Sequence, residues 1–212
     1  MNKLILKVAL KTIAVVLSLI IIILAVITIF TPMTLAKMNK KLGNNSLAAS
    51  FTIIEYNRNK DINNLADIIE LSIISKNYSR IKKYSNLLID HTKFDEYCAF
   101  KDNNNDINIY ASYKQYIYGW NVTALYYRYE KQLALEKAKS IIPLDYSKNN
   151  AMRYLILAVA ENNDKEMAED ISIFLQNRIT DILAEGNDVT EQELIAERLE
   201  TDINFLKIII EK

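Results

Sequence analysis

The chain contains one histidine and one cysteine, and these two residues limit the metal and nucleophile chemistry open to it. Cys98 follows His91 by about two helical turns, so a helix could bring the two side chains near each other. Zinc takes four ligands, or three with a water, and one histidine with one cysteine is too few. The pair could supply a thiolate nucleophile. The pattern favours instead a histidine at the edge of a core and a small buried thiol.

A second candidate for metal binding is the polar segment KDNNNDIN at residues 101–108. Asp102, Asn104 and Asp106 match positions 1, 3 and 5 of a calcium-binding loop. That loop also needs a glycine at position 6 and a bidentate glutamate at position 12, where this chain has Ile107 and Tyr113. We therefore interpret the segment as a solvated polar loop, and the sequence predicts no metal and no cofactor.

Adjacent carboxylates are the remaining candidates for acid–base chemistry, and they occur at Asp95–Glu96, Glu169–Asp170 and Glu191/Glu193. A glycosidase needs two carboxylates that face each other about 5–10 Å apart across a cleft. Neighbours on one helix point in different directions, so these charges are interpreted as the solvated faces of helices. Since no catalytic set is complete, the sequence names no catalytic residue and favours a protein that is not an enzyme.

The most unusual local feature is an aromatic run between residues 110 and 129. We predict that this segment contains the partner-binding residues, namely Tyr113, Tyr116, Tyr118, Trp120, Tyr126, Tyr127 and Tyr129. Tyrosine and tryptophan are enriched at binding hot spots because they bury a large area and keep a polar tip. The same rings could stack on a sugar chain, or could fill the core between two helices.

Helical spacing divides these rings into two groups. Positions 113, 116, 120 and 127 share one side of a helix, whereas positions 118, 126 and 129 cannot all join them. We therefore expect at least one of the two groups to be accessible to solvent.

A long apolar stretch, Thr12 to Phe30, precedes all of these residues. Its nineteen uncharged positions would rise about 28 Å as a helix, close to the thickness of a membrane's hydrocarbon core. A cleaved signal peptide has a shorter apolar region and a site of small residues, and Thr34-Leu35-Ala36 matches such a site poorly. The sequence therefore predicts a single transmembrane helix, retained as an anchor in membrane lipid.

Lysines flank this stretch on both sides, at Lys3, Lys7, Lys11, Lys37, Lys40 and Lys41. The positive-inside rule gives a small preference for a cytoplasmic N-terminus, and short basic tails usually stay inside. We expect a basic cytoplasmic tail over residues 1–11, a transmembrane helix over 12–30 and an extracytoplasmic domain over 31–212. The protein would then be a single-pass protein of the cell membrane.

Composition excludes one class of partner and favours one class of fold. The domain after residue 30 carries 23 basic and 26 acidic groups, so it lacks the basic excess typical of nucleic-acid binders. Three glycines and two prolines are few for a sheet with tight turns, and neither phosphate-binding glycine pattern occurs.

Apolar residues recur at helical spacing through nearly the whole domain, which predicts an all-α fold of antiparallel helical hairpins. A polar loop is expected near residues 101–108. We also expect Ser46 to cap a helix whose inner face holds Leu47, Phe51 and Ile54. Asp61 is expected to cap the next helix, whose inner residues are Leu65, Ile68, Ile69 and Ser72. The last helix is expected to carry one apolar seam, formed by Ile195, Leu199, Ile203, Leu206 and Ile210.

Two internal similarities suggest a repeat. The apolar residues Leu35, Phe51 and Ile54 correspond to Ile68, Tyr84 and Leu87 at a shift of 33. The residues Leu125, Leu133, Ala134 and Ile141 correspond to Val159, Met167, Ala168 and Leu175 at a shift of 34. A period near 34 with paired helices resembles tetratricopeptide-type repeats, in which small residues such as Ala134 and Ala168 let paired helices approach closely. The resemblance covers about two-thirds of the chain. The Trp-x-x-Leu-Gly pattern of that family is absent. The resemblance implies a repeat-like array of hairpins, and an irregular helical bundle is the alternative.

Two functions from different classes follow. The first is a membrane-anchored, non-enzymatic interaction or scaffold protein that binds a protein or peptide partner at the cell envelope. The second is an envelope enzyme or glycan-binding module that uses the aromatic segment 110–129. A pocket in which aromatic rings converge with a carboxylate of raised pKa would favour the second function, and an open groove without one would favour the first.

Overall fold

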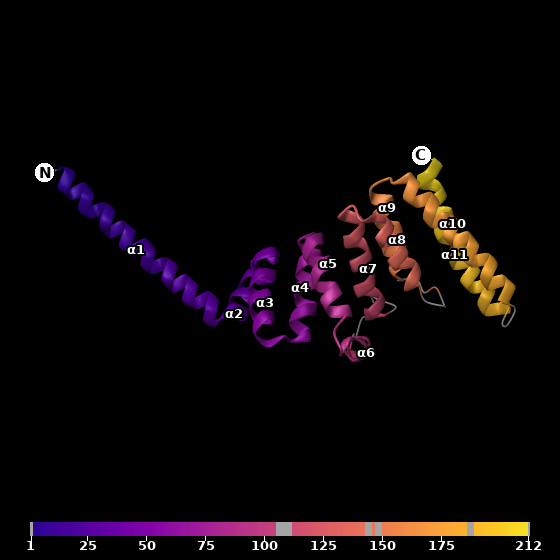
Figure 1. Ribbon diagram of the computed structural model, residues 1–212, viewed down its shortest axis with the longest axis horizontal. Coiled ribbons are helices and arrows are strands. Elements are labelled where there is room, and N and C mark those ends of the chain that lie inside the picture. The colour runs from indigo at the N-terminus through magenta and orange to yellow at the C-terminus, as the bar shows by residue number, and fades with distance from the viewer. Residues whose placement is uncertain (1, 105–111, 143–145, 147–149, 186–188, 212) are drawn as a thin grey trace. The chain divides into compact units, whose positions relative to one another are not determined.

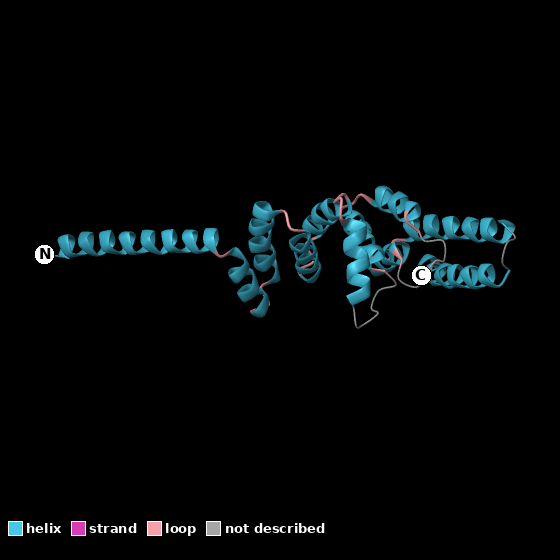
Figure 2. Ribbon diagram, turned by 90° about the horizontal axis from the view of Figure 1, so that it is seen from below, coloured by secondary structure: helices cyan, strands magenta, loops and turns pink. Residues whose placement is uncertain are grey.

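The computed structural model describes residues 2–104, 112–142, 146, 150–185 and 189–211. In this part of the chain every regular element is a helix (Figures 1 and 2). The all-α prediction is therefore confirmed. The eleven helices of these described ranges are α1 (Asn2–Phe30), α2 (Pro32–Lys41), α3 (Asn45–Asn59), α4 (Ile62–Ile74), α5 (Tyr78–Ile89), α6 (Phe94–Asn104), α7 (Tyr113–Tyr127), α8 (Lys131–Ser140), α9 (Ala151–Glu161), α10 (Lys165–Glu185) and α11 (Val189–Glu211).

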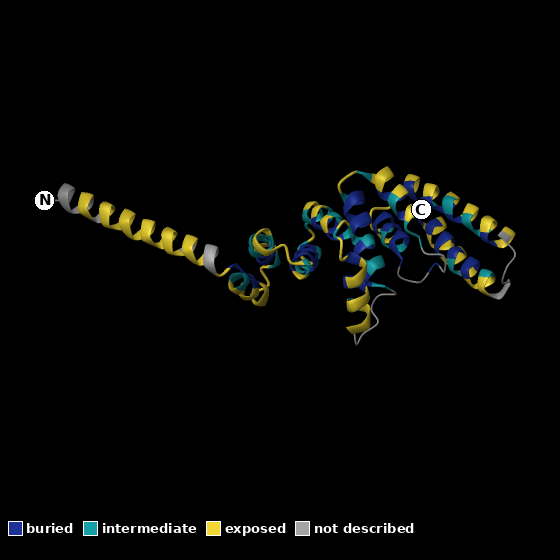
Figure 3. Cartoon of the chain, turned by 60° about the horizontal axis from the view of Figure 1, so that its bottom comes forward, coloured by how far each residue is buried: buried dark blue, intermediate teal, exposed yellow. Residues whose placement is uncertain are grey.

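The chain divides into two compact units, residues 1–75 and 76–212. In the first unit, α1 contains the window Leu10–Ile27, which has a mean hydropathy of 2.9 and no buried residue. The described side chains of α1 are exposed on every side (Figure 3). By length and composition, this helix is sufficient to cross a membrane.

The rest of the first unit is built from α2, α3 and α4, with α3 packed against both neighbours. Pro32 occupies the first turn of α2, where its missing N–H costs nothing. In α4 the predicted cap is confirmed, since the Asp61 side chain accepts a hydrogen bond from the N–H of Asn63. The predicted inner residues of α4 are also buried, and they are Leu65, Ile68, Ile69 and Ser72.

The sequence prediction for α3 was wrong about which face of the helix is buried and about which residue caps its start. Asn44, not Ser46, is the N-cap, and the buried residues are Ala48, Ala49 and Thr52. Leu47 is 54% exposed. Ala48 and Ala49 form a cluster with Leu71 of α4, so two small side chains let the two helices approach closely.

The second unit has a single large core that α7 to α11 share. Helix α7 packs against α5, α8 and α9, while α10 packs against α9 and α11. Four of the five residues in the seam predicted for the last helix are buried, namely Ile195, Leu199, Ile203 and Leu206. The fifth, Ile210, is only partly buried, and its neighbour Ile209 is buried instead. Figure 3 shows this as buried and exposed faces that alternate along α10 and α11. The helices of the second unit therefore present amphipathic faces to a common interior.

Helix α6 was not predicted from the sequence. It buries Phe94, Tyr97 and Cys98 and continues to Asn104, so the first four residues of the expected polar loop are helical. Asp106 and the rest of that loop, to residue 108, lie outside the described residues. The Asp102 carboxylate accepts a hydrogen bond of 2.7 Å from the N–H of Tyr113 at the start of α7. A side chain that looked like a calcium ligand thus satisfies a free N–H of a helix.

Turns between consecutive helices repeat one backbone geometry in the described part of the chain. In each turn a residue with positive φ is followed by the residue that directly precedes the next helix. With Lys60 before α4 included, the geometry occurs at five turns, and the positive-φ residues are Gly43 (76°), Lys60 (55°), Lys76 (51°), Tyr129 (64°) and Asn163 (50°). The carbonyl of the residue that follows the positive-φ residue accepts a hydrogen bond from an N–H in the first turn of the next helix. The donors are Ala48, Leu65, Ile81, Ala134 and Ala168 in turn. Positions 43 and 76 are related by a shift of 33 and positions 129 and 163 by a shift of 34, which are the two shifts found in the sequence.

Candidate functional site

The aromatic segment forms α7 and the turn after it, and its rings differ widely in exposure. Tyr113 and Tyr126 are 2% and 4% exposed, whereas Tyr129 in the turn is 91% exposed. The other four predicted residues are half-buried, namely Tyr116, Tyr118, Trp120 and Tyr127. Neither of the two groups expected from helical spacing is accessible as a whole, because α7 is covered on several sides. The role of these seven residues in partner binding stays a prediction.

One side of α7 packs against α6 through its rings. Tyr118 meets the ring of Phe94 edge to face at 6.0 Å, and Tyr113 meets Tyr97 in the same way at 5.9 Å. Burial raises the pKa of the Tyr118 phenol, with Lys114 acting in the opposite direction. These contacts hold α6 against α7. Edge-to-face ring pairs stabilise a fold by more than the burial of their apolar area alone would give.

A second set of ring contacts joins α7 to Tyr154 of α9. The rings of Tyr116 and Trp120 lie edge to face with Tyr154 at 6.4 Å and 5.9 Å. This approach depends on Gly119, because a Cβ built there would lie 2.3 Å from the Tyr154 ring. Tyr154 was not among the predicted residues, yet it is the ring around which this side of the site is arranged.

The end of α7 meets the start of α5 and the end of α9. Tyr127 stacks on Tyr78 with ring centroids 4.2 Å apart and donates a hydrogen bond to the Glu161 carboxylate. Burial and that hydrogen bond raise the pKa of Tyr127 to about 12. Burial, followed by the negative charge of Glu161, also raises the pKa of Tyr78. Both phenols therefore stay neutral at pH 7.

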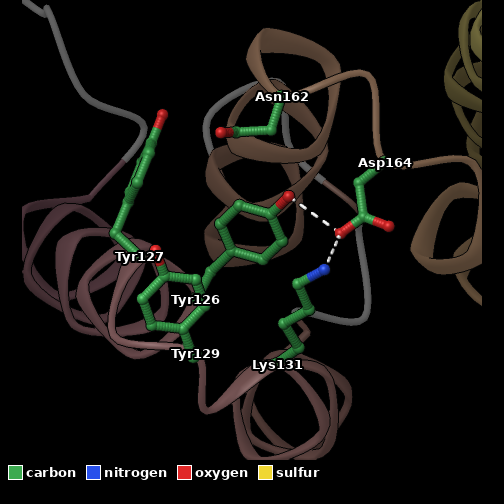
Figure 4. A pocket seen from close by; sticks show the side chains of 6 residues that line it. All are labelled: Tyr126, Tyr127, Tyr129, Lys131, Asn162 and Asp164. Carbon is green, nitrogen blue, oxygen red and sulfur yellow. Dashed lines mark hydrogen bonds and ion pairs between the residues drawn. The ribbon is translucent and has the colours of Figure 1, made fainter.

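A separate hollow of about 360 Å³ lies at the turns after α7 and α9 (Figure 4). Asp164 is one of the residues that line it, and its carboxylate accepts a hydrogen bond from the Tyr126 hydroxyl at 2.9 Å and pairs with Lys131 at 2.6 Å. Burial alone would raise the Asp164 pKa. The bonds from Lys131, from Tyr126 and from the N–H of Met167 outweigh burial, so the pKa lies below its ordinary value. Asp164 is therefore a charged carboxylate that holds neighbouring groups together. A carboxyl group that acts as a general acid needs a raised pKa, and the pKa of Asp164 is lowered.

Two further hollows meet on α9. The smaller has a volume of about 200 Å³ and the larger about 460 Å³, and they share Tyr154 and Leu157. We call the combined surface the α9 groove and define it by Tyr78, Trp120, Tyr127, Tyr154, Leu157 and Phe205. Leu157 is 58% exposed and Phe205 is 41% exposed. The groove therefore offers apolar and aromatic area to solvent along α5, α7, α9 and α11.

An ion pair between a half-buried arginine and a buried aspartate forms one wall of the larger hollow. Arg153 on α9 donates two hydrogen bonds to Asp202 on α11, at 2.9 Å and 2.7 Å, and the Tyr146 hydroxyl donates a third. Asp202 is 6% exposed and Tyr146 is 2% exposed. The hydrogen bond to Asp202 raises the pKa of Arg153, whereas burial opposes that shift. This network fixes α11 against α9 and so holds Phe205 beside Leu157.

The other chemical candidates from the sequence do not form a site in the described residues. Cys98 is buried, and burial, Asp102 and Asp95 together raise its pKa to about 12, so the thiol stays protonated. A thiolate nucleophile needs the opposite shift. No group of three or more His, Cys, Asp or Glu side chains suited to a metal occurs among the described residues.

Sequence reasoning missed Tyr78, Tyr154, Leu157, Glu161 and Phe205. A signal for three of these residues was nevertheless present, because the shift of 34 that relates α7 to α9 maps Trp120 onto Tyr154. The same shift maps Thr123 onto Leu157 and Tyr127 onto Glu161. Equivalent positions of α7 and α9 thus line one surface.

Comparisons of the chain with protein-family models, with curated proteins and with solved structures give no match.

Proposed function

We propose that the chain is a membrane-anchored, non-enzymatic protein that binds a protein or peptide partner at the cell envelope through the α9 groove. The observation that carries this proposal is the groove itself, an open surface on which Leu157 and Phe205 expose apolar side chains. Exposed apolar surface rimmed by polar groups is typical of a place where another molecule docks.

The repeating turns support an extended binding surface. The positive-φ turns at Tyr129 and Asn163 join α7 to α8 and α9 to α10, and they are related by the same shift of 34. Arrays of helical hairpins, tetratricopeptide-type repeats among them, place equivalent helices side by side and bind peptides along them. On this proposal α7 and α9 are equivalent helices, and the groove lies along their equivalent positions.

The helix α1 supports the membrane part of the proposal. It is apolar throughout the window Leu10–Ile27, and none of that window is buried. In water such a helix would leave a large apolar area uncovered, whereas lipid would cover it. If the basic residues at the N-terminus lie in the cytoplasm, residues 31–212 lie on the other, extracytoplasmic side of the membrane.

A photo-crosslinking amino acid placed in living cells tests the binding surface. At Leu157 it should capture a specific partner, because that side chain lines the groove. Leu133 on α8 is the matched control, since it is 53% exposed and does not line any of the hollows described above. Equal capture from both positions, or from neither, would refute the proposed surface.

A further inference from the structure

The smaller hollow of the α9 groove has the composition of a pocket for a cation. Four aromatic rings line it, from Tyr78 on α5, Trp120 and Tyr127 on α7, and Tyr154 on α9. The faces of aromatic rings carry partial negative charge and attract guanidinium and ammonium groups. At about 200 Å³, the space suits one side-chain end group rather than a whole peptide segment.

The pocket also contains a polar group that has no hydrogen-bond partner within the described part of the chain. Thr123 is 6% exposed, and its hydroxyl makes no hydrogen bond among the described residues. Such a buried hydroxyl loses its hydrogen bonds to water and gains nothing in return, which is unfavourable unless a ligand supplies them. Thr123 lines the hollow, and its hydroxyl oxygen is covered by neighbouring side chains, so a ligand with N–H donors would reach it once those side chains adjust.

The fixed charges at the pocket favour a positive ligand. Glu161 lines it, and the bond from the Tyr127 hydroxyl holds its carboxylate in place. Tyr127 and Glu161 are also the last residues of α7 and α9, so two helix C-termini add negative potential. Lys76 and the N-terminus of α5 act in the opposite direction. Lys76 is exposed on a flexible stem and can turn toward water.

We propose that this pocket binds the guanidinium group of an arginine side chain, which the partner supplies. This inference rests on the proposed function, because it assumes a peptide partner in the groove. A guanidinium group has five N–H donors and no acceptor, so it can donate hydrogen bonds to the Glu161 carboxylate and to the Thr123 hydroxyl oxygen at the same time. Its planar face stacks on aromatic rings, which a compact ammonium group does less well.

The chain contains its own reporter for the test. Trp120 is the only tryptophan in the sequence and it lines the pocket, so its fluorescence responds to a bound ligand. Full-length protein in nonionic detergent micelles would be titrated with acetyl-arginine-methylamide and, in parallel, with the neutral isostere acetyl-citrulline-methylamide. We expect a saturable change in Trp120 emission with the arginine compound and an affinity at least threefold weaker with citrulline. Equal responses to the two compounds, or none to either, would overturn the inference.

Charge variants give a second test. Removal of the carboxylate in Glu161→Gln should weaken arginine binding about threefold to fivefold, and Lys76→Ala should strengthen it. Glu166→Gln is the control, since Glu166 is an exposed glutamate at the start of α10 and does not line the pocket. An unchanged affinity in Glu161→Gln would contradict the pocket chemistry.

The two proposals can fail separately. Partner capture at Leu157 with no arginine response at Trp120 would retain the binding groove and reject the arginine pocket. An arginine response with no capture would retain the pocket and reject the peptide groove.

Discussion

The ring of Tyr154 lies against the backbone of Gly119, at a distance of 2.3 Å from the place where a Cβ atom would stand. A methyl group at this position would force apart α7 and α9 or move the ring. Gly119→Ala should therefore lower the free energy of unfolding by about 1 kcal/mol, because overpacking of roughly 1–3 kcal/mol exceeds the gain in helix propensity. Thermal or urea unfolding measures this change.

The double variant Gly119→Ala/Tyr154→Ala isolates the contact. In the Tyr154→Ala background the clash is gone, so the added methyl should stabilise the protein by up to about 1 kcal/mol. If Gly119→Ala destabilises equally in both backgrounds, the ring does not determine the need for glycine.

The second prediction compares two ion pairs that differ in burial. Asp202 is 6% exposed and accepts two hydrogen bonds from Arg153. Asp95 pairs with Lys114, and the Asp95 side chain is 79% exposed. Asp202→Asn should lower the free energy of unfolding by about 2–4 kcal/mol, because it removes the charge that faces a half-buried guanidinium. Asp95→Asn should cost less than about 1 kcal/mol. Similar losses in both variants would contradict the structural role of Asp202.

The third prediction concerns stability in acid. Bonds from Lys131, Tyr126 and Met167 hold the pKa of Asp164 below its ordinary value. A carboxylate with a lowered folded-state pKa contributes stability that is fully present above the unfolded-state value of about 4 and is lost as the pH falls through the folded-state value. Asp164→Asn should therefore be less stable than the wild type at pH 7, and this difference should shrink toward pH 3. A difference that is constant with pH would exclude this linkage.

The fourth prediction concerns topology. A cysteine introduced at Asn104, an exposed residue at the end of α6, should react in intact cells with a thiol reagent that cannot cross membranes. The native Cys98 is 3% exposed and should contribute little background. A cysteine at Asn2 is the control and should react only after lysis. The reverse pattern would place residues 31–212 in the cytoplasm.

The parts of the fold that follow from helical spacing were predictable. The Asp61 cap and the buried seam Ile195, Leu199, Ile203 and Leu206 each rest on one local pattern. The face of α3 was not predictable in this way, because its contact with α4 uses small alanines rather than its large apolar residues. Helix α6 was missed because its last turn is polar and its buried residues are few.

The groove was harder to predict than the helices. The aromatic run drew attention to α7, but Tyr78, Tyr154 and Phe205 come from three other helices. Only tertiary packing brings these rings together, and a glycine makes that packing possible. The shift of 34 could have linked Trp120 to Tyr154, whereas Phe205 had no comparable signal.

The most direct test of the account compares partner capture with folding in groove variants. Full-length Leu157→Ser and Phe205→Ser would be expressed in cells, crosslinked and purified, with Leu133→Ser as the matched control. Exposed side chains contribute little to stability but can contribute about 1 kcal/mol or more to binding, so capture should fall about fivefold or more in the groove variants while their melting temperatures stay close to the wild type. Leu133→Ser should capture as well as the wild type. Undiminished capture by correctly folded Leu157→Ser and Phe205→Ser would contradict the proposal that this groove binds the partner.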